Sequence, residues 1–151
     1  MPKIIAIEGL AELDDALTEL PKATARNVLL RTLMAEGQRI ADAGAINAPK
    51  RTHRLEESYT VGTKLSRRQK AMLKKESDVE VYVGPGPFKR SVQTEFGNAH
   101  QAAQPHLRPA WDSNVNAVLD GIKKTLTDEI EKARKRLARK AEREAAKLKA
   151  L

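Results

Sequence analysis

The C-terminal third of the chain carries one uninterrupted helical pattern that is longer than a domain of this size. From Pro109 onward, apolar residues recur at a mean spacing near 3.6, which predicts a single amphipathic helix. The members of this stripe are Val115, Leu119, Ile122, Leu126, Ile130, Ala133 and Leu137. If the helix follows the weaker stripe that ends at Leu148, it is about 60 Å long at 1.5 Å per residue. We therefore expect one domain, residues 1–137, and a basic helical extension, residues 138–151, that projects, packs on another chain or frays.

Two further helices are expected nearer the start of the chain. Leucines at positions 10, 13, 17 and 20 recur at spacings of three and four, which predicts a short helix after Gly9. A longer periodic segment predicts a helix from Lys22 to Ala45, and Asn47-Ala48-Pro49 ends it because the residue before a proline is disfavoured in a helix. The apolar stripe of the longer helix consists of Ala25, Leu29, Leu33, Gly37, Ile40 and Gly44. Since glycine weakens a helix interior, we expect the two glycines where another backbone approaches closely.

Three short segments have the composition of strands. Lys3–Ile7 is rich in isoleucine and predicts a short strand, and Tyr59–Lys64 alternates in polarity. The clearest candidate is Asp78–Val83, whose three valines would share one face. Gly84-Pro85-Gly86-Pro87 is expected to end that strand.

The segment between the two later strands is too long for a tight hairpin. We expect these strands to be antiparallel neighbours joined by the excursion Leu65–Ser77, which would include a helical turn around Arg67–Leu73. The predicted fold class is therefore α+β: a small antiparallel sheet packed against two long helices, with a C-terminal helix that extends beyond the domain.

Positive charge is concentrated in the middle of the chain. The net charge is +8, and residues 50–90 hold eleven Lys or Arg against five Asp or Glu, whereas residues 1–49 have a net charge of −2. This asymmetry fits either a surface that meets a polyanion or a solvated surface. A candidate DNA-facing basic loop contains Lys64, Arg67, Arg68, Lys70, Lys74 and Lys75. The loop lacks aromatic residues, so it suits contact with a phosphate backbone and not the reading of bases. The basic run that begins at Arg134 is expected to form pairs within its helix, such as Glu131–Lys135.

The sequence offers no set of residues for catalysis. It contains no cysteine, which excludes disulfides, thiolate metal sites and cysteine nucleophiles. His53, His100 and His106 do not have the spacing of a zinc site, and neither a G-x-S-x-G elbow nor a phosphate-binding glycine loop is present. We expect no enzymatic activity and no cofactor or metal. No apolar stretch approaches the roughly 20 residues of a membrane span, and the first residues do not form a signal peptide, so a soluble protein made inside the cell is expected.

Four motifs in a fixed order resemble a known family. They are Ala45-Ile46-Asn47-Ala48-Pro49 followed by Thr52, Leu55 and Ser58, then Val81-Tyr82-Val83-Gly84-Pro85, then Glu95-Phe96-Gly97, and then Ala103-Gln104-Pro105-His106-Leu107-Arg108-Pro109-Ala110-Trp111. Over residues 22–130 the chain resembles the phage family of head–tail joining or tail-completion proteins found in long, non-contractile-tailed phages and prophages. Three positions depart from the family pattern: His53 replaces glycine, Asn98 replaces threonine and His106 replaces phenylalanine. The excursion Leu65–Ser77 is not part of that pattern.

The resemblance implies a structural virion protein of the phage neck or upper tail. Such proteins form a ring, expected here to have six subunits, around the channel through which DNA leaves the head, after assembly in the host cytoplasm. The implied neighbours are head-closure or connector proteins and tail-tube or tail-terminator proteins, with non-specific contact to double-stranded DNA. Candidate interface residues are Glu95, Phe96, Gly97, Pro105, Leu107, Arg108, Pro109 and Trp111, which would either contact a neighbouring subunit or clamp the start of the last helix. Two alternatives remain open: a tail terminator, and a non-specific nucleic-acid-binding protein supported by charge alone.

Overall fold

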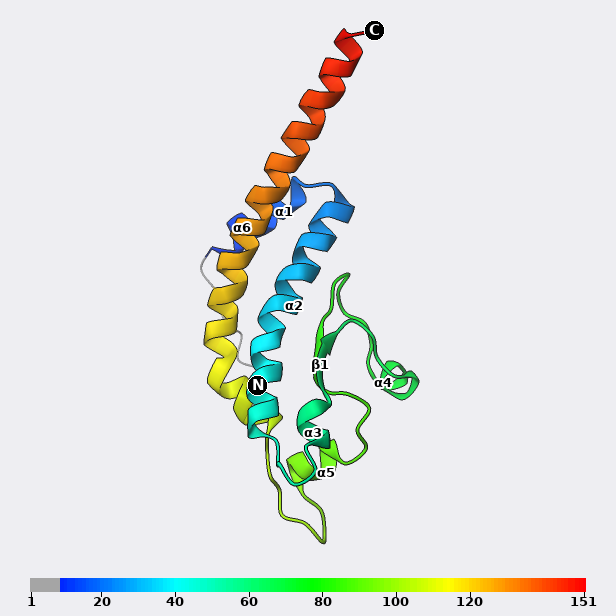
Figure 1. The fold of residues 1–151 in the computed structure, drawn as a ribbon, viewed down its shortest axis with the longest axis vertical. Coiled ribbons are helices and arrows are strands. Elements are labelled where there is room, and N and C mark those ends of the chain that lie inside the picture. Colours follow the sequence, from blue (N-terminus) through cyan, green and yellow to red (C-terminus); the bar gives the residue numbers. More distant parts are fainter. Residues whose placement is uncertain (1–8) are drawn as a thin grey trace.

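Two long helices run side by side and form the body of the protein in a computed structural model that describes residues 9–151 (Figure 1). The expected strand Lys3–Ile7 lies outside the described residues. Among residues 9–151 the elements are six helices and two strands, in the order α1 (Leu10–Thr18), α2 (Lys22–Asn47), α3 (Arg54–Glu57), β1 (Tyr59–Gly62), α4 (Arg67–Met72), β2 (Tyr82–Pro85), α5 (Ser91–Phe96) and α6 (Leu107–Lys149). The fold is α+β, as the sequence predicts.

Helix α2 lies between its two partners, with α6 on one side and the β1–β2 hairpin on the other (Figure 1). This double packing explains why the stripe predicted from periodicity is only partly correct. The residues of α2 buried toward α6 are Val28, Thr32, Glu36 and Ile40, whereas Leu29 and Leu33 are only partly buried. A single apolar stripe is expected for a helix that packs on one partner. Because α2 packs on two, its buried residues do not follow one stripe.

The two glycines of α2 receive the hairpin. A Cβ atom at Gly37 would lie 3.0 Å from Val83 Cγ2 and 3.1 Å from Val61 Cγ1, and one at Gly44 would overlap the ring of Tyr59. The close approach expected at these glycines is thus real. It is made by strand side chains and not by another backbone.

The two strands are antiparallel neighbours, as predicted, in a register that pairs Tyr59 with Pro85 and Val61 with Val83. The predicted limits of the second strand are wrong: it begins at Tyr82 and includes Gly84 and Pro85. Because β1 is four residues long, it offers partners to only four residues of β2. Upstream of β2, the chain instead turns around the carboxylate of Glu80, which accepts hydrogen bonds from the backbone N–H groups of Glu76 and Ser77 at 2.7 and 3.0 Å.

Helix α6 begins two residues before Pro109 and continues without interruption for 43 residues, about 65 Å. Its first two-thirds pack on α2 and α1 through Ala110, Val118, Leu126, Ile130 and Ala133. From residue 138 onward every residue is exposed, and the helix projects beyond the rest of the protein (Figure 1). The predicted extension is therefore a helix that projects.

Candidate subunit-contact site

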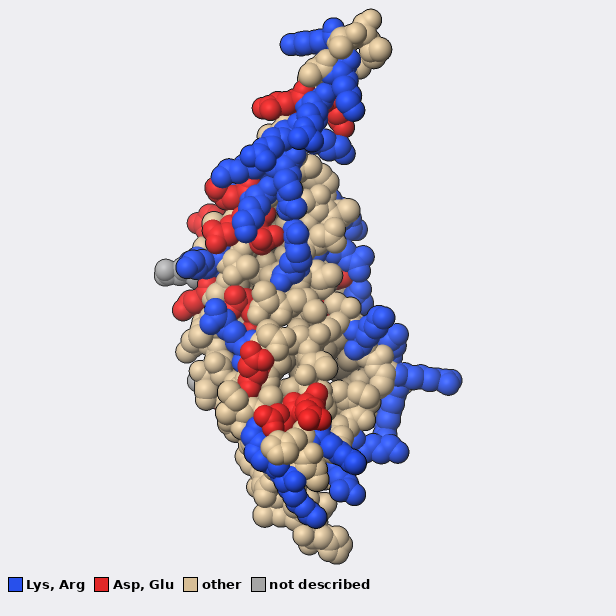
Figure 2. Space-filling model, viewed as in Figure 1, with Lys and Arg blue, Asp and Glu red and all other residues tan. Residues whose placement is uncertain are grey.

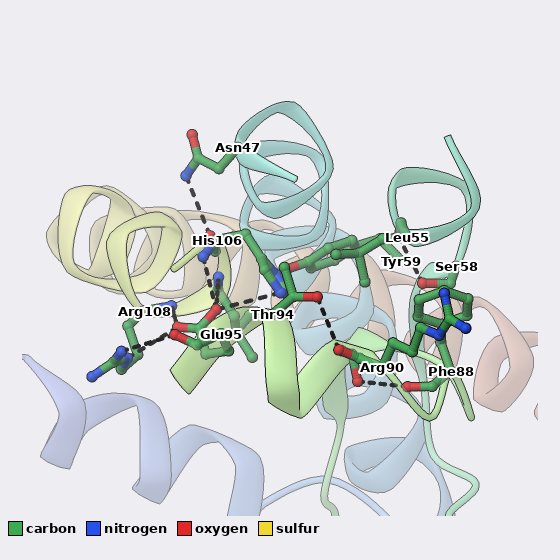
Figure 3. A network of polar contacts seen from close by, with 12 residues as sticks. Asn47, Leu55, Ser58, Tyr59, Phe88, Arg90, Thr94, Glu95, His106 and Arg108 are labelled. Atoms are coloured by element: carbon green, nitrogen blue, oxygen red, sulfur yellow. Dashed lines mark hydrogen bonds and ion pairs between the residues drawn. The ribbon is translucent and has the colours of Figure 1, made fainter. Parts of the chain in front are cut away.

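Residues from three of the four motifs singled out in the sequence meet at the end of the protein where α6 begins (Figure 3). Glu95, in α5, is only 5% exposed, and its carboxylate accepts hydrogen bonds from the backbone N–H groups of His106, Leu107 and Arg108 at 2.7, 2.9 and 3.1 Å. The first N–H groups of a helix have no partner within the helix, and the helix dipole favours negative charge at this end. Glu95 therefore caps the longest helix of the protein from a separate element.

Arg108 completes this cap on its outer side. Its Nε donates to Glu95 Oε1 at 3.0 Å, and a terminal guanidinium nitrogen donates to the backbone oxygen of Glu95 at 3.2 Å. Burial raises the pKa of the Glu95 carboxyl, but the three backbone N–H groups and Arg108 outweigh it and lower that pKa to about 2. Glu95 is accordingly a charged structural group at neutral pH.

His106 fills the inner side of the junction and is 1% exposed. Its Nδ1 forms a hydrogen bond with the hydroxyl of Tyr59, its Nε2 lies 3.5 Å from Glu95 Oε2, and its backbone oxygen accepts from Asn47 Nδ2 at 3.3 Å. Burial, and after it the charge of Glu95, raises the pKa of Tyr59. The imidazole thus joins Tyr59 of β1 to Glu95 of α5, and it packs edge to face on the Tyr59 ring, while the backbone oxygen of His106 makes the link to α2.

The loop between α5 and α6 is folded back on α5. Gln104 N–H donates to the backbone oxygen of Thr94 at 2.8 Å, and Asn98 pairs with Gln101 as an isolated bridge. Gly97 has φ +76, and a Cβ there would lie 2.8 Å from the backbone nitrogen of Ala103. This position therefore requires glycine.

The remaining motif residues point outward. Phe96 is 61% exposed and Trp111 is 51% exposed, although the chain has only five Phe, Trp and Tyr residues in all. The guanidinium of Arg108 lies 4.6 Å from the centre of the Phe96 ring. Trp111 follows Arg108 by three residues and so lies on the same helix face, and Val92, 64% exposed, precedes Phe96 by four on α5. We call these four residues, Val92, Phe96, Arg108 and Trp111, the aromatic surface.

The candidate interface residues thus divide into two sets. Glu95, Gly97 and Leu107 build the junction, and Pro109 occupies the first turn of α6. Phe96, Arg108 and Trp111 face solvent, while Pro105 is exposed at the end of the connecting loop. The clamp on the helix start is therefore present within the chain, and an exposed surface lies directly beside it.

The six cations of the basic loop are all exposed and lie on and around α4, away from the junction (Figures 1 and 2). Helix α4, which lies where a helical turn is predicted, begins with a capping box: the side-chain oxygens of Ser66 and Gln69 each accept a hydrogen bond from the backbone N–H of the other residue. Met72 and Leu73 are exposed beside these cations. The structure does not bring the basic loop and the aromatic surface together.

Comparison of the chain with protein-family models, curated proteins and solved structures found no match. Within residues 9–151, no group of three or more His, Asp or Glu is placed to hold a metal ion. No helix in the same range combines the length and apolar character needed to span a bilayer.

Sequence reasoning missed the two features that build the site. Helix α5 is not predicted, although Val92 and Phe96 have helical spacing. The cap by Glu95 is also not predicted as such, because its donors lie eleven to thirteen residues further along the chain, beyond any local capping pattern. Outside the site, sequence reasoning also missed buried Glu36, a residue of α2 that faces α6. Its carboxylate accepts hydrogen bonds from Thr125 Oγ1 at 3.1 Å and from Arg39 Nε at 2.9 Å.

Proposed function

We propose that the chain is a structural subunit of the neck or upper tail of a long-tailed phage. In this proposal, copies of the chain form a ring, expected to have six members, that surrounds the DNA channel, completes the tail and joins it to the head. The observation that carries the proposal is the aromatic surface held beside the Glu95 cap. Three of its four residues, Phe96, Arg108 and Trp111, belong to the motifs that carry the family resemblance.

The aromatic surface has the composition of a protein interface. Trp, Phe and Arg are enriched where proteins bind one another, and residues of these types contribute most of the binding energy of many interfaces. Burying Phe96 and Trp111 inside this chain would have enlarged its small core, yet both are left exposed. The cap fixes the angle between α5 and α6, so the surface is already ordered before a partner binds, which reduces the entropy lost on association.

A ring requires two different surfaces on each subunit, because every copy contacts one neighbour on each side. The aromatic surface supplies one of them. The basic loop lies elsewhere on the protein and, in this proposal, faces the DNA in the channel, where contact with phosphates needs charge and no reading of bases. A tail-terminator role would use the same surfaces, and we place it second.

The first test is the mass of the full-length chain in solution. We expect native mass spectrometry and negative-stain electron microscopy to show closed rings, and the double variant Phe96→Ala/Trp111→Ala to dissociate into 16.7 kDa monomers that stay folded. The matched control is Met72→Ala/Leu73→Ala, which removes two exposed apolar side chains from the basic loop and should leave the ring intact. A wild-type chain that stays monomeric at high concentration, or a ring unaffected by the double variant, contradicts the proposal.

The second test is genetic. Deletion of the gene from its phage or prophage is expected to yield DNA-filled heads and separate tails, visible by electron microscopy. Infectious particles assembled without the protein would rule out a head–tail joining role.

A further inference from the structure

The projecting part of α6 carries a straight line of positive charge. Lys132, Arg136, Arg139, Arg143 and Lys147 follow one another at spacings of four, three, four and four, so they lie on one face of the helix. At 1.5 Å per residue this basic row is about 22 Å long. All five residues are exposed.

Most of the basic row is not neutralised by the residues that the structure describes. Lys132 pairs with Glu129 at 3.3 Å, but the other four cations form no ion pair with any residue between 9 and 151. Two acidic residues of the same helix segment pair with lysines outside the row, Glu131 with Lys135 and Glu144 with Lys140, each at 4.0 Å, and the third, Glu142, forms no ion pair with any residue between 9 and 151. The first of these is the pair predicted from the sequence.

An unneutralised row of like charges weakens the helix that carries it. Lys132–Arg136, Arg139–Arg143 and Arg143–Lys147 are like-charge pairs four residues apart, and each such pair slightly destabilises an isolated helix. A solubilising surface would have its charges mixed, as they are on the neighbouring faces of α6. An external polyanion lying along the row would reduce this repulsion among its cations.

The basic row also continues toward the basic loop. Arg136 and Leu30 line a groove between α2 and α6. Leu30 also lines a hollow whose charged residues are three cations and two carboxylates: Arg26, Lys70, Lys75, Asp78 and Glu80. Because Leu30 belongs to both, the two depressions adjoin. Figure 2 shows Lys and Arg side chains along the projecting helix and again at the edge where the basic loop lies.

We infer that the basic row is a sequence-independent binding site for the phosphate backbone of double-stranded DNA, and that it forms one track with the basic loop. A rigid, straight row of charges matches a stiff duplex, which presents one phosphate per 1.7 Å of its axis. Binding of a flexible single strand normally uses aromatic side chains that stack on bases, and the row has none. The choice of DNA as the polyanion rests on the proposed function. The alternative is that the row binds the acidic face of α1 on a second copy, where Glu12, Asp15 and Glu19 are exposed.

The test compares two double variants of the full-length chain that remove the same charge from the same helix. Arg139→Gln/Arg143→Gln breaks the row, whereas Lys135→Gln/Lys149→Gln removes two cations outside it. Binding to a 30-base-pair duplex is measured by fluorescence anisotropy between 50 and 300 mM KCl. Since each lost phosphate contact lowers the slope of log K against log salt by about 0.9, the row variant should lower it by about 1.8 and the control by less than about 0.5.

A third variant keeps the charge. Arg139→Lys/Arg143→Lys should retain the wild-type slope, because contact with phosphates requires charge and not the shape of the guanidinium. Circular dichroism checks that all variants keep their helix, which is expected because the altered residues are exposed.

Several results would overturn the inference. Equal slopes for the row variant and its control would mean that only net charge matters, and a wild-type chain without affinity for the duplex at 50 mM KCl would exclude the site. If the row variant lowers the particle mass measured without DNA and leaves the DNA slope unchanged, the row binds another copy. The particle mass tests the proposed ring independently of DNA binding. A monomer that binds DNA through the row supports this inference and contradicts the proposed ring.

Discussion

Replacing Glu95 with glutamine removes one negative charge at the start of α6 and keeps the size of the side chain. In the folded chain the Glu95 pKa is about 2, against 4.5 for an ordinary glutamate. At 1.36 kcal/mol per pKa unit, this difference corresponds to about 3 kcal/mol of unfolding free energy at pH 7. The glutamine side chain also places an NH2 donor where a carboxylate oxygen accepted hydrogen bonds from backbone N–H groups. We therefore expect Glu95→Gln to lower the free energy of unfolding by at least this amount.

The pH dependence of this stability difference separates the effect of the Glu95 charge from the effect of the side chain's shape. A carboxyl whose pKa is lowered by folding contributes its full stability above 4.5 and loses it as the pH falls toward 2. The part of the difference between wild type and Glu95→Gln that comes from charge should therefore shrink as the pH falls below 4.5, to roughly half of its pH 7 value at about pH 3. Other carboxyls titrate in both proteins, so their effects cancel in the difference.

Urea denaturation followed by circular dichroism at pH 7, 4 and 3 measures this difference. The control is Glu131→Gln, which removes an exposed partner 4.0 Å from Lys135 and should change stability by less than about 0.5 kcal/mol at each pH. A difference for Glu95→Gln that does not vary with pH would refute the ionised cap.

Four further variants test the packing. Gly44→Ala would force a methyl group into the Tyr59 ring and should reduce stability by about 1–3 kcal/mol, whereas Gly62→Ala, with no atom within 4 Å of the new Cβ, should be near neutral in thermal denaturation. Tyr59→Phe removes the hydrogen bond to buried His106 and should reduce the free energy of unfolding by about 1–3 kcal/mol; an unchanged value would show that the bond contributes nothing. A chain that ends at Leu137 should unfold at the same temperature as the full-length protein, because residues 138–151 have no buried side chain, and a clearly lower temperature would mean that they pack on something.

The sequence alone predicted the long elements and failed on elements that depend on distant partners. The periodic segments ending at Pro49 and beginning near Pro109 are helices close to their predicted limits, because periodicity and proline act within a few residues. The strand expected at Asp78–Val83 begins at Tyr82, since its start depends on where β1 offers hydrogen-bond partners. The motif named Glu95 and Phe96 together as candidate interface residues, and it could not show that Glu95 is buried and Phe96 exposed.

The amino-acid sequence by itself determined the two long helices, the antiparallel pair of strands, the basic loop and the length of helix that projects from the body. Each of these follows from the spacing of apolar residues, from prolines and glycines, or from clustered charge, all of which act locally along the chain. Only the tertiary structure decided which face of α2 is buried, that His106 lies against Tyr59, and that Glu95 turns inward to cap α6 while its neighbour Phe96 turns outward. These outcomes depend on groups brought together from separate elements, and a contact between separate elements leaves no periodic signal in either of them.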